Sequence, residues 1–320
     1  MRSKTIRIAG LGVPHDYRTS LVPLIIEHLG YRIQWASALS ADLVIYGSFY
    51  DVNAPRLRWL PRAWRQKAAR WVDMVDQQLS KRKIPPVTLF HTAENLRQDQ
   101  IKADFAISHD LDIDSDRHFR LPYWMEMIDW SHEGLVGNRN PRYGELLKLE
   151  RLQAPLGGQF LKRAQKAVLI TSHLQEPRAT CLLALQELMP VDGMGPYFNK
   201  DIKHHHTSNF LKKEILKEYA FNLCPENGMY PGYVTEKIPE AFAAGCLPIT
   251  FVDESVNRDF NPKAFMNLAP MLGNNFEQLE GLLKLKDRLE DYANQPLVIG
   301  SPNTVGLQNF LGFIAASATC

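Results

Sequence analysis

Two adjacent charged residues, Glu236 and Lys237, follow a strand-like run and a polar loop in the second half of the sequence. Residues 219–224 are apolar and aromatic, whereas residues 225–232 contain Glu-Asn-Gly and Pro-Gly, which cannot extend a strand. A glutamate accepts hydrogen bonds from ribose hydroxyls, and a lysine neutralises a diphosphate as a point charge. The residue types therefore suit a nucleotide site, although the pair alone also fits a solvated Glu-Lys pair on a helix surface.

The residues around this pair predict the elements that would position it. Residues 235–244 have helical character, Gly245 stands where a C-cap glycine belongs, and residues 247–251 indicate the next strand. Because Pro239 is tolerated only near the first turn of a helix, we expect the helix to begin close to the Glu-Lys pair. This layout places both side chains at the carboxyl end of a strand, where open α/β sheets bind nucleotides.

The whole segment 219–251 resembles the donor-binding signature of the α-1,3/4-fucosyltransferases, glycosyltransferase family ten. The shared pattern is an aromatic strand, Glu-Asn, a short loop, Tyr-Val-Thr-Glu-Lys and a Pro-containing strand. Residues 259–265 resemble the segment that follows in bacterial members. The resemblance implies that Asn227 and Tyr233 line the donor pocket with Glu236 and Lys237. Tyr233 equally suits a core aromatic with its hydroxyl at the surface.

Two earlier parts of the sequence also resemble the family. The first is similar to its acceptor-side motif, a Gly-Glu-Asn turn, a strand and an Arg-x-x-Arg-x-Pro segment, and consists of residues 92–95, 104–108 and 117–122. The second is similar to a Ser-Asn, Arg and Val-Asp-x-x-Gly series and consists of Ser172, His173, Arg178 and residues 191–195. The resemblance therefore covers roughly residues 86–270.

Four places depart from the family pattern. Ala93 replaces a glycine, His173 an asparagine, and Ala220 a residue that is often lysine. Residues 252–254, Val-Asp-Glu, replace a usual Gly-Ser-Pro. None of these changes removes a charged residue that the chemistry needs, but the last leaves a different GDP-linked sugar open as the donor.

Transfer of a sugar from a nucleoside diphosphate to a hydroxyl needs a base, cationic stabilisation of the leaving group and a pocket for two substrates. Glu94 follows the strand-like residues 87–91 in a polar turn, and the resemblance makes it the general base. Without the surrounding motif it would fit an ordinary loop glutamate. Arg178 and Lys237 would stabilise the diphosphate, Arg178 as a bidentate fork. A base opposite the leaving group implies direct displacement with inversion.

The strand pattern predicts an α/β fold with two halves. We expect strands at residues 5–9, 42–46, 87–91 and 105–108, and then at 168–171, 219–224, 247–251 and 265–268, with a helix at 179–188. The resemblance implies a GT-B architecture, two Rossmann-like domains facing across a cleft. Residues 1–158 would bind the acceptor and residues 159–320 the GDP-sugar donor. Helices near residues 276–294 and 305–316 are expected to pack back across the junction.

Composition and cysteine usage agree with this interpretation. The 320 residues, 45% hydrophobic, suffice for two cores, and a net charge of +2 provides no field for nucleic acid. The four cysteines lack CxxC spacing and are expected to be reduced. The first residues contain no apolar run long enough for a signal peptide or a membrane span. This predicts a cytoplasmic enzyme, or alternatively a membrane-anchored enzyme trimmed of its anchor.

Three other features suggest different ligands. The Asp-rich residues 110–116 could hold a divalent metal, but the Arg and Lys side chains supply the same charge, so no metal is expected to be required. The histidines at 204–206 favour a solvated loop, because three consecutive histidines do not all face one ion. Residues 56–83 have a basic, Trp-bearing helical pattern that suits either a core helix, which we favour, or a peripheral contact with an anionic membrane.

The prediction is thus an inverting fucosyltransferase that moves L-fucose from GDP-fucose to a hydroxyl of an acceptor glycan, GlcNAc or glucose in an oligosaccharide or lipopolysaccharide. An α-1,3 linkage follows from the resemblance. The alternatives are a GT-B transferase that uses another GDP-sugar, and a noncatalytic nucleotide-binding or glycan-binding module of the same fold. The charged residues Glu94, Arg178 and Lys237 argue against the module.

Overall fold

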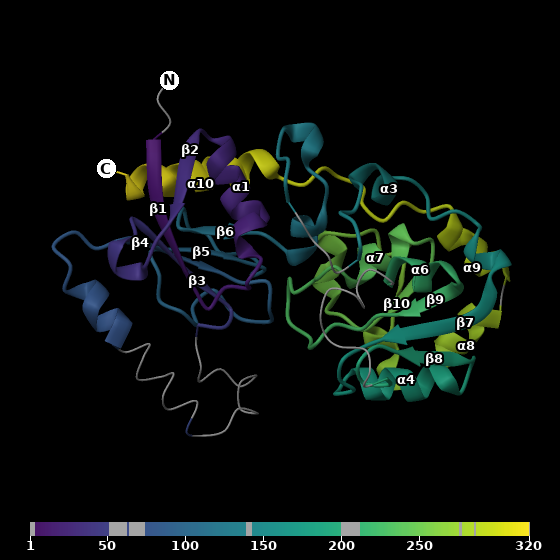
Figure 1. Ribbon diagram of the computed structural model, residues 1–320. Coiled ribbons are helices and arrows are strands. Elements are labelled where there is room, and N and C mark those ends of the chain that lie inside the picture. Colours follow the sequence, from purple (N-terminus) through teal and green to yellow (C-terminus); the bar gives the residue numbers. More distant parts are fainter. Residues whose placement is uncertain are drawn as a thin grey trace. The chain divides into compact units, whose positions relative to one another are not determined.

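The computed structural model of the protein describes residues 4–50, 63, 74–138, 143–199, 212–274, 277–284 and 286–319. The chain divides into two compact units, each with its own parallel sheet and helices (Figure 1). Unit 1 takes residues 1–121, 130–138 and 303–320, and unit 2 takes residues 122–129 and 139–302. Residues 139–158, which the predicted division at 158 assigned to the first part, thus lie in unit 2, and the last helix lies in unit 1. The assignment of acceptor and donor to the two parts stays a prediction.

Unit 1 is built on a parallel sheet with the strand order β2-β1-β3-β4-β5-β6. Its strands are β1 (Lys4–Leu11), β2 (Tyr31–Trp35), β3 (Leu43–Gly47), β4 (Val87–His91), β5 (Phe105–Ser108) and β6 (His118–Arg120). Every residue of β3 and β5 is buried, which fits the apolar sequence of strands that are covered on both faces. The carboxyl ends of β4, β5 and β6 therefore lie along one edge of this sheet.

Two helices from opposite ends of the chain pack in unit 1. Helix α1 (Leu21–His28) buries Val22, Ile25 and Ile26. Helix α10 (Thr304–Ala318) contacts α1 and β4, and it lies beside α1 in Figure 1. Asn303 caps α10, because its side chain accepts a hydrogen bond from the backbone N–H of Gly306 at 2.9 Å.

Unit 2 is built on a second parallel sheet, with the order β11-β10-β9-β7-β8. Its strands are β7 (Ala164–Ile170), β8 (Val191–Met194), β9 (Tyr219–Leu223), β10 (Leu247–Thr250) and β11 (Met266–Asn267). From β7 the chain first enters β8 on one side and later enters β9 on the other side. A topological switch point therefore lies between β7 and β9, and ligands of open α/β sheets bind outside the carboxyl ends of the strands at such a point.

Helices surround this second sheet. They are α3 (Leu149–Gln153), α4 (Arg178–Gln186), α6 (Lys212–Lys217), α7 (Lys237–Ala243), α8 (Glu277–Lys284) and α9 (Lys286–Ala293). Short 3-10 helices in the two units span Tyr17–Thr19, Ala38–Ser40, Tyr123–Met127, Ser131–Glu133, Phe160–Lys162, Glu254–Arg258 and Ala269–Asn274.

The predicted start and end of α7 are confirmed. The helix begins at Lys237, with Pro239 in its first turn. Gly245 follows it with φ of +78°, and its N–H donates to the Phe242 carbonyl at 2.9 Å. The Cys246 N–H donates to the Ala241 carbonyl at 3.0 Å, so these two bonds close the helix as a C-capping glycine motif does.

The predicted strands are all present, but β2, β6 and β8 were not predicted. The residues of β2 are half-buried or exposed in alternation, because this strand lies at the edge of its sheet. Strand β8 has the sequence Val-Asp-Gly-Met, whose Asp-Gly pair is typical of a turn. The predicted helix at 276–294 consists of two helices, α8 and α9.

Two predicted features fall largely outside the described residues. These are the histidines at 204–206 and most of the basic segment 56–83, including Trp64 and Trp71. At the end of that segment residues 74–80 are helical, and Val75 and Leu79 are buried. Over the ranges of the chain given above, no helix has the length and apolar character needed to cross a bilayer.

Candidate functional site

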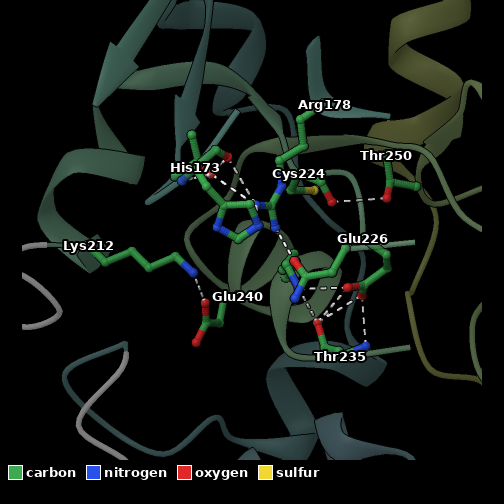
Figure 2. Close-up of polar contacts among 11 residues, drawn as sticks. His173, Arg178, Lys212, Cys224, Glu226, Thr235, Glu240 and Thr250 are labelled. Atoms are coloured by element: carbon green, nitrogen blue, oxygen red, sulfur yellow. Dashed lines mark hydrogen bonds and ion pairs between the residues drawn. The ribbon is translucent and has the colours of Figure 1, made fainter. Parts of the chain in front are cut away.

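Polar side chains from several loops gather beyond the carboxyl ends of β7 and β9 in unit 2 (Figure 2). Thr171 and His173 follow β7, and Arg178 is the first residue of α4. Two further segments, residues 226–227 after β9 and residues 235–237 at the start of α7, complete the group. The sheet topology brings these segments together, because both strands end at the same edge.

Arg178 is a buried cation at the centre of the first half of this group. Its Nη1 donates to Thr171 Oγ1 at 3.1 Å and to the His173 carbonyl at 3.3 Å, and it lies 2.9 Å from His173 Nε2. Its Nη2 donates to Asn227 Oδ1. Burial lowers the pKa of Arg178, while the neighbouring Glu226, Tyr233 and Glu236 act in the opposite direction.

These contacts bring two predicted site residues, Arg178 and Asn227, together and fix the guanidinium plane. They also show a task for His173, which stands where the family pattern has asparagine. Because the arginine can only donate, the imidazole Nε2 accepts the hydrogen bond and supports the guanidinium. Both Thr171 and His173 are positioning residues for Arg178.

Glu226 forms the second half of the group and was not among the predicted site residues. It is 0% exposed, and its Oε1 accepts from the Thr235 N–H and hydroxyl, each at 2.8 Å. Its Oε2 accepts from Lys237 Nζ at 2.6 Å, and Lys237 Nζ also donates to Thr235 Oγ1 at 2.6 Å. The signal in the sequence was the carboxylate itself, which lies shortly after the buried strand β9 and before the Thr-Glu-Lys run.

The pairing with Glu226 changes the electrostatics expected of Lys237. The lysine is not an isolated point charge, because a fully buried carboxylate balances it. Its side chain keeps 16% exposure, whereas that of Glu226 has none. The alternative of a solvated Glu-Lys pair on a helix surface is wrong, since Glu236 is also buried.

Tyr233 and Glu236 are held in the loop before α7. Tyr233 is buried, and its N–H donates to the Tyr230 carbonyl at 3.0 Å. Glu236 is the residue immediately before the first turn of α7. Both side chains influence Arg178 electrostatically, which places them near the guanidinium. Their roles toward a donor stay predictions.

A second buried ion pair joins α6 and α7. Lys212 Nζ donates to Glu240 Oε2, and Figure 2 shows the pair in the same view as Arg178 and Glu226. Burial favours the neutral lysine, but Glu240 and Glu236 outweigh it and raise the pKa of Lys212. This part of unit 2 thus contains the cations of Arg178, Lys212 and Lys237.

Glu94 lies in unit 1, in the turn that follows β4. The Glu94 N–H donates to Thr92 Oγ1 at 3.1 Å, and the Glu94 carbonyl accepts from the same hydroxyl at 3.1 Å. Ser48 Oγ lies 2.8 Å from Thr92 Oγ1 and ties the turn to the segment after β3. Glu94 is half-buried, at a position that its backbone contacts fix.

The Asp-rich segment after β5 supports the same turn. Asp110 is buried, and its Oδ2 accepts from the Gln98 N–H at 2.7 Å and from Ser108 Oγ at 2.8 Å. His118 Nε2 lies 2.8 Å from Ser108 Oγ. Asp110 therefore holds the backbone that follows Glu94. In the part of the chain that the structure describes, no three His, Cys, Asp or Glu side chains are grouped as a metal would require.

Three of the four cysteines lie in the described residues. Cys181, Cys224 and Cys246 are free and buried. Burial raises the pKa of the Cys181 thiol to about 12, and Glu176 adds to the effect. These thiols are therefore poor nucleophiles.

Comparison with known proteins finds similarity to fucosyltransferases. Residues 160–294 match the family described as "Glycosyltransferase family 10 (fucosyltransferase) C-term". The α-(1,3)-fucosyltransferase FucT of Helicobacter pylori is 31% identical over 197 residues, which are 56% of this chain and 40% of that protein. The α-(1,3)-fucosyltransferase B of Drosophila melanogaster is 27% identical over 115 residues, 33% of this chain and 25% of that protein. The chain thus spans two fifths or less of these curated relatives.

Solved structures match over nearly the whole chain. A crystal structure of an α1,3-fucosyltransferase covers 98% of this chain with a TM-score of 0.65 and 23% identity, and 90% of that chain is covered. A crystal structure of an α1,3-fucosyltransferase with GDP-fucose covers 98% of this chain with a TM-score of 0.64 and 22% identity, and 91% of that chain is covered. The predicted α/β fold of the GT-B class is confirmed. The family match itself is confined to residues 160–294, which are similar to the C-terminal part of the glycosyltransferase family 10 fucosyltransferases.

Proposed function

We propose that this protein is a fucosyltransferase that moves L-fucose from GDP-fucose to a hydroxyl of an acceptor glycan. The observation that carries the proposal is the set of contacts that the buried Arg178 and Glu226 make at the carboxyl edge of the unit 2 sheet, Arg178 with the exposed Asn227 and Glu226 with the half-buried Lys237. This set lies inside the region that matches the family. One of the similar solved structures is described as holding GDP-fucose, which supports the choice of donor.

The cations would stabilise the leaving diphosphate. Arg178 presents a guanidinium that three neighbours hold in place, and Lys237 presents an ammonium that Glu226 holds. Because these groups are ordered before the donor binds, they stabilise the charge that develops on the diphosphate without reorganising. The same cations supply the charge that a divalent metal would otherwise supply, so the proposal requires no metal and no other cofactor.

Glu94 would act as the general base. Its carboxylate would take the proton of the acceptor hydroxyl as the oxygen attacks the anomeric carbon and the bond to the diphosphate breaks. Attack from the face opposite the leaving group inverts the configuration at that carbon in one step. The contacts of Thr92 and Ser48 with the Glu94 turn support this role, because they limit the positions open to its carboxylate.

The acceptor we propose is a glycan that ends in GlcNAc or glucose, as in an oligosaccharide or a lipopolysaccharide, with an α-1,3 linkage. The named relatives are α-(1,3)-fucosyltransferases, which supports the linkage. We also propose that the enzyme works in the cytoplasm, with a core helix as the favoured role of residues 56–83 and a peripheral membrane contact as the alternative.

A transfer assay tests the proposal. The purified chain is incubated with GDP-fucose and a panel of lactosamine-type acceptors, with and without a chelator, and GDP release and glycan mass are followed. We expect the acceptor mass to rise by one deoxyhexose in both conditions. A mass gain only with another GDP-sugar would show that the donor is not GDP-fucose. A mass gain that the chelator abolishes would overturn the metal-independent mechanism. GDP binding with no transfer to any acceptor would favour a binding module.

A further inference from the structure

Two neighbouring aromatic residues, Tyr197 and Phe198, follow β8 at the carboxyl edge of the unit 2 sheet. Their ring centroids lie 5.0 Å apart with an angle of 86° between the planes, so the rings meet edge to face. Tyr197 is 48% exposed and Phe198 is 40% exposed. The pair therefore presents aromatic surface to solvent at the edge of the sheet where the candidate site lies.

The backbone connects this aromatic pair to the Arg178 group. The Thr171 N–H donates to the Met194 carbonyl at 2.9 Å, and the Tyr197 N–H donates to the Thr171 carbonyl at 3.1 Å. Thr171 is also the residue whose hydroxyl accepts from Arg178. One residue therefore anchors both the guanidinium and the aromatic pair, so their separation is fixed by the fold.

Gly193 in β8 makes room for the Phe198 ring. A Cβ atom at this position would lie 2.4 Å from Phe198 Cε1, so the ring occupies the space above the glycine backbone. Glycine weakens a strand and often marks a close approach of another group. The ring is therefore held against β8 before any ligand binds, and a preorganised surface loses less entropy when a ligand stacks on it.

The position of the pair in the sheet suggests its ligand. The cations lie at the switch point between β7 and β9, where a diphosphate would bind, and β8 is the next strand outward from β7. In doubly wound sheets the nucleoside extends from the phosphates toward that neighbouring strand. We propose that Tyr197 and Phe198 form a stacking surface for the nucleobase of the donor, an inference that rests on the proposed function.

Comparing the affinities of two ligands, GDP and inorganic pyrophosphate, separates the contribution of the base from that of the phosphates. Titration calorimetry measures the Kd of GDP and of inorganic pyrophosphate for the full chain and its variants. We expect Tyr197→Ala to weaken GDP binding by about 5- to 100-fold, the usual range for one stacked base. Pyrophosphate affinity should stay within about twofold, because pyrophosphate has no ring to stack. Tyr197→Phe keeps the ring and should bind GDP like the original chain.

Two further variants test whether the position of the Phe198 ring matters and whether the loss of any exposed apolar side chain would have the same effect. Gly193→Ala keeps both aromatic residues but displaces the Phe198 ring, so it should also weaken GDP binding and spare pyrophosphate. Leu183→Ala removes another exposed apolar side chain of the same unit, on α4, and should change neither affinity.

The outcomes distinguish this inference from the proposed function. GDP binding that is unchanged in Tyr197→Ala would overturn the stacking surface and leave the donor site intact. An equal loss of GDP and pyrophosphate affinity would overturn it as well, because it would show a general effect on the phosphate group. A failure of the original chain to bind GDP would instead overturn the proposed donor.

Discussion

The pairing of Lys237 with Glu226 gives the lysine two tasks that can be separated. A buried carboxylate needs its cation, and removing one partner of such a pair costs about 3–5 kcal/mol. Under the proposed function, the diphosphate of the donor needs the same cation. Loss of nucleotide binding in a lysine variant alone would therefore mix a folding defect with a binding defect.

A double variant separates these tasks. We expect Lys237→Met to lower the free energy of unfolding by about 3–5 kcal/mol, because Glu226 loses its cation. The double variant Glu226→Gln with Lys237→Met should recover much of this loss but should still bind GDP weakly. Urea unfolding and GDP calorimetry on the two proteins provide the measurements. Normal GDP affinity in the double variant would show that Lys237 has no part in binding the diphosphate.

The proposed base gives a second prediction at this scale. Glu94→Gln should lower the transfer rate by about 10² to 10⁴-fold while the Kd of GDP stays unchanged, because the amide cannot take a proton. Asp99→Asn is the matched control: this carboxylate is 58% exposed at the surface and should keep full activity. Equal transfer by the Glu94 variant and the control would remove Glu94 from the mechanism.

The sequence predicted the charged residues of the site better than their partners. Arg178 was predicted to bind the diphosphate and Asn227 to line the donor pocket, and the contact between their side chains was not predicted. Glu226 was not selected, because a carboxylate after a strand does not by itself reveal which side chain it will contact. Its contact with Lys237 depends on how residues 227–234 fold back, and no local pattern encodes that path.

At the scale of elements, strand prediction succeeded for the inner strands of both sheets and for the edge strand β11, and it failed at the other three edge strands, β2, β6 and β8. β3, β5, β9 and β10 consist of consecutive buried residues, which gives an apolar run in the sequence. β8 contains Asp192 and Gly193, and this composition indicates a turn. Its place in the sheet is set by pairing with β7, and the Phe198 ring packs over the glycine.

The end of α7 offers a test of the capping geometry. Gly245→Ala should lower the free energy of unfolding by about 1–2 kcal/mol, because φ is +78° there and L-residues avoid this region. The added Cβ would also lie 3.0 Å from Arg163 Nη2, which donates to the Ala244 carbonyl. Urea unfolding measures the change.

Gly281→Ala is the matched control for this substitution. Gly281 lies within α8 with open space where a Cβ would be, so the substitution should stabilise by up to about 1 kcal/mol. If both substitutions changed stability by the same amount and sign, the argument from φ would be wrong.

At the scale of the whole molecule, the burial of one histidine leads us to expect a lower free energy of unfolding in acid. Burial lowers the pKa of His109 in unit 1 to about 4, and Arg120 and His118 add to the effect against the attraction of Asp110. The unfolded chain binds this proton near its ordinary pKa of about 6.5, so stability is lost as the pH falls from 6.5 toward 4. The expected loss between pH 7 and pH 5 is about 2 kcal/mol.

Urea unfolding of the full chain at the two pH values checks this expectation. His109→Asn should show a smaller loss between pH 7 and pH 5 than the original chain, whatever its stability at pH 7. His132→Gln is the control, because the side chain of His132 is 48% exposed, and it should keep the original loss. The same loss in the His109 variant and the original chain would assign the effect to other groups.

The place of α10 in unit 1 has a consequence for synthesis on the ribosome. The helix buries Leu307, Leu311 and Ile314, and it contacts α1 and β4, although residues 139–302 of unit 2 separate it from them in the sequence. The strands of unit 1 therefore leave the ribosome first but wait for their last covering helix until all of unit 2 has emerged. The unit that is translated second is complete first, so a chain that stalls before residue 303 carries an uncovered apolar surface, the kind that chaperones recognise.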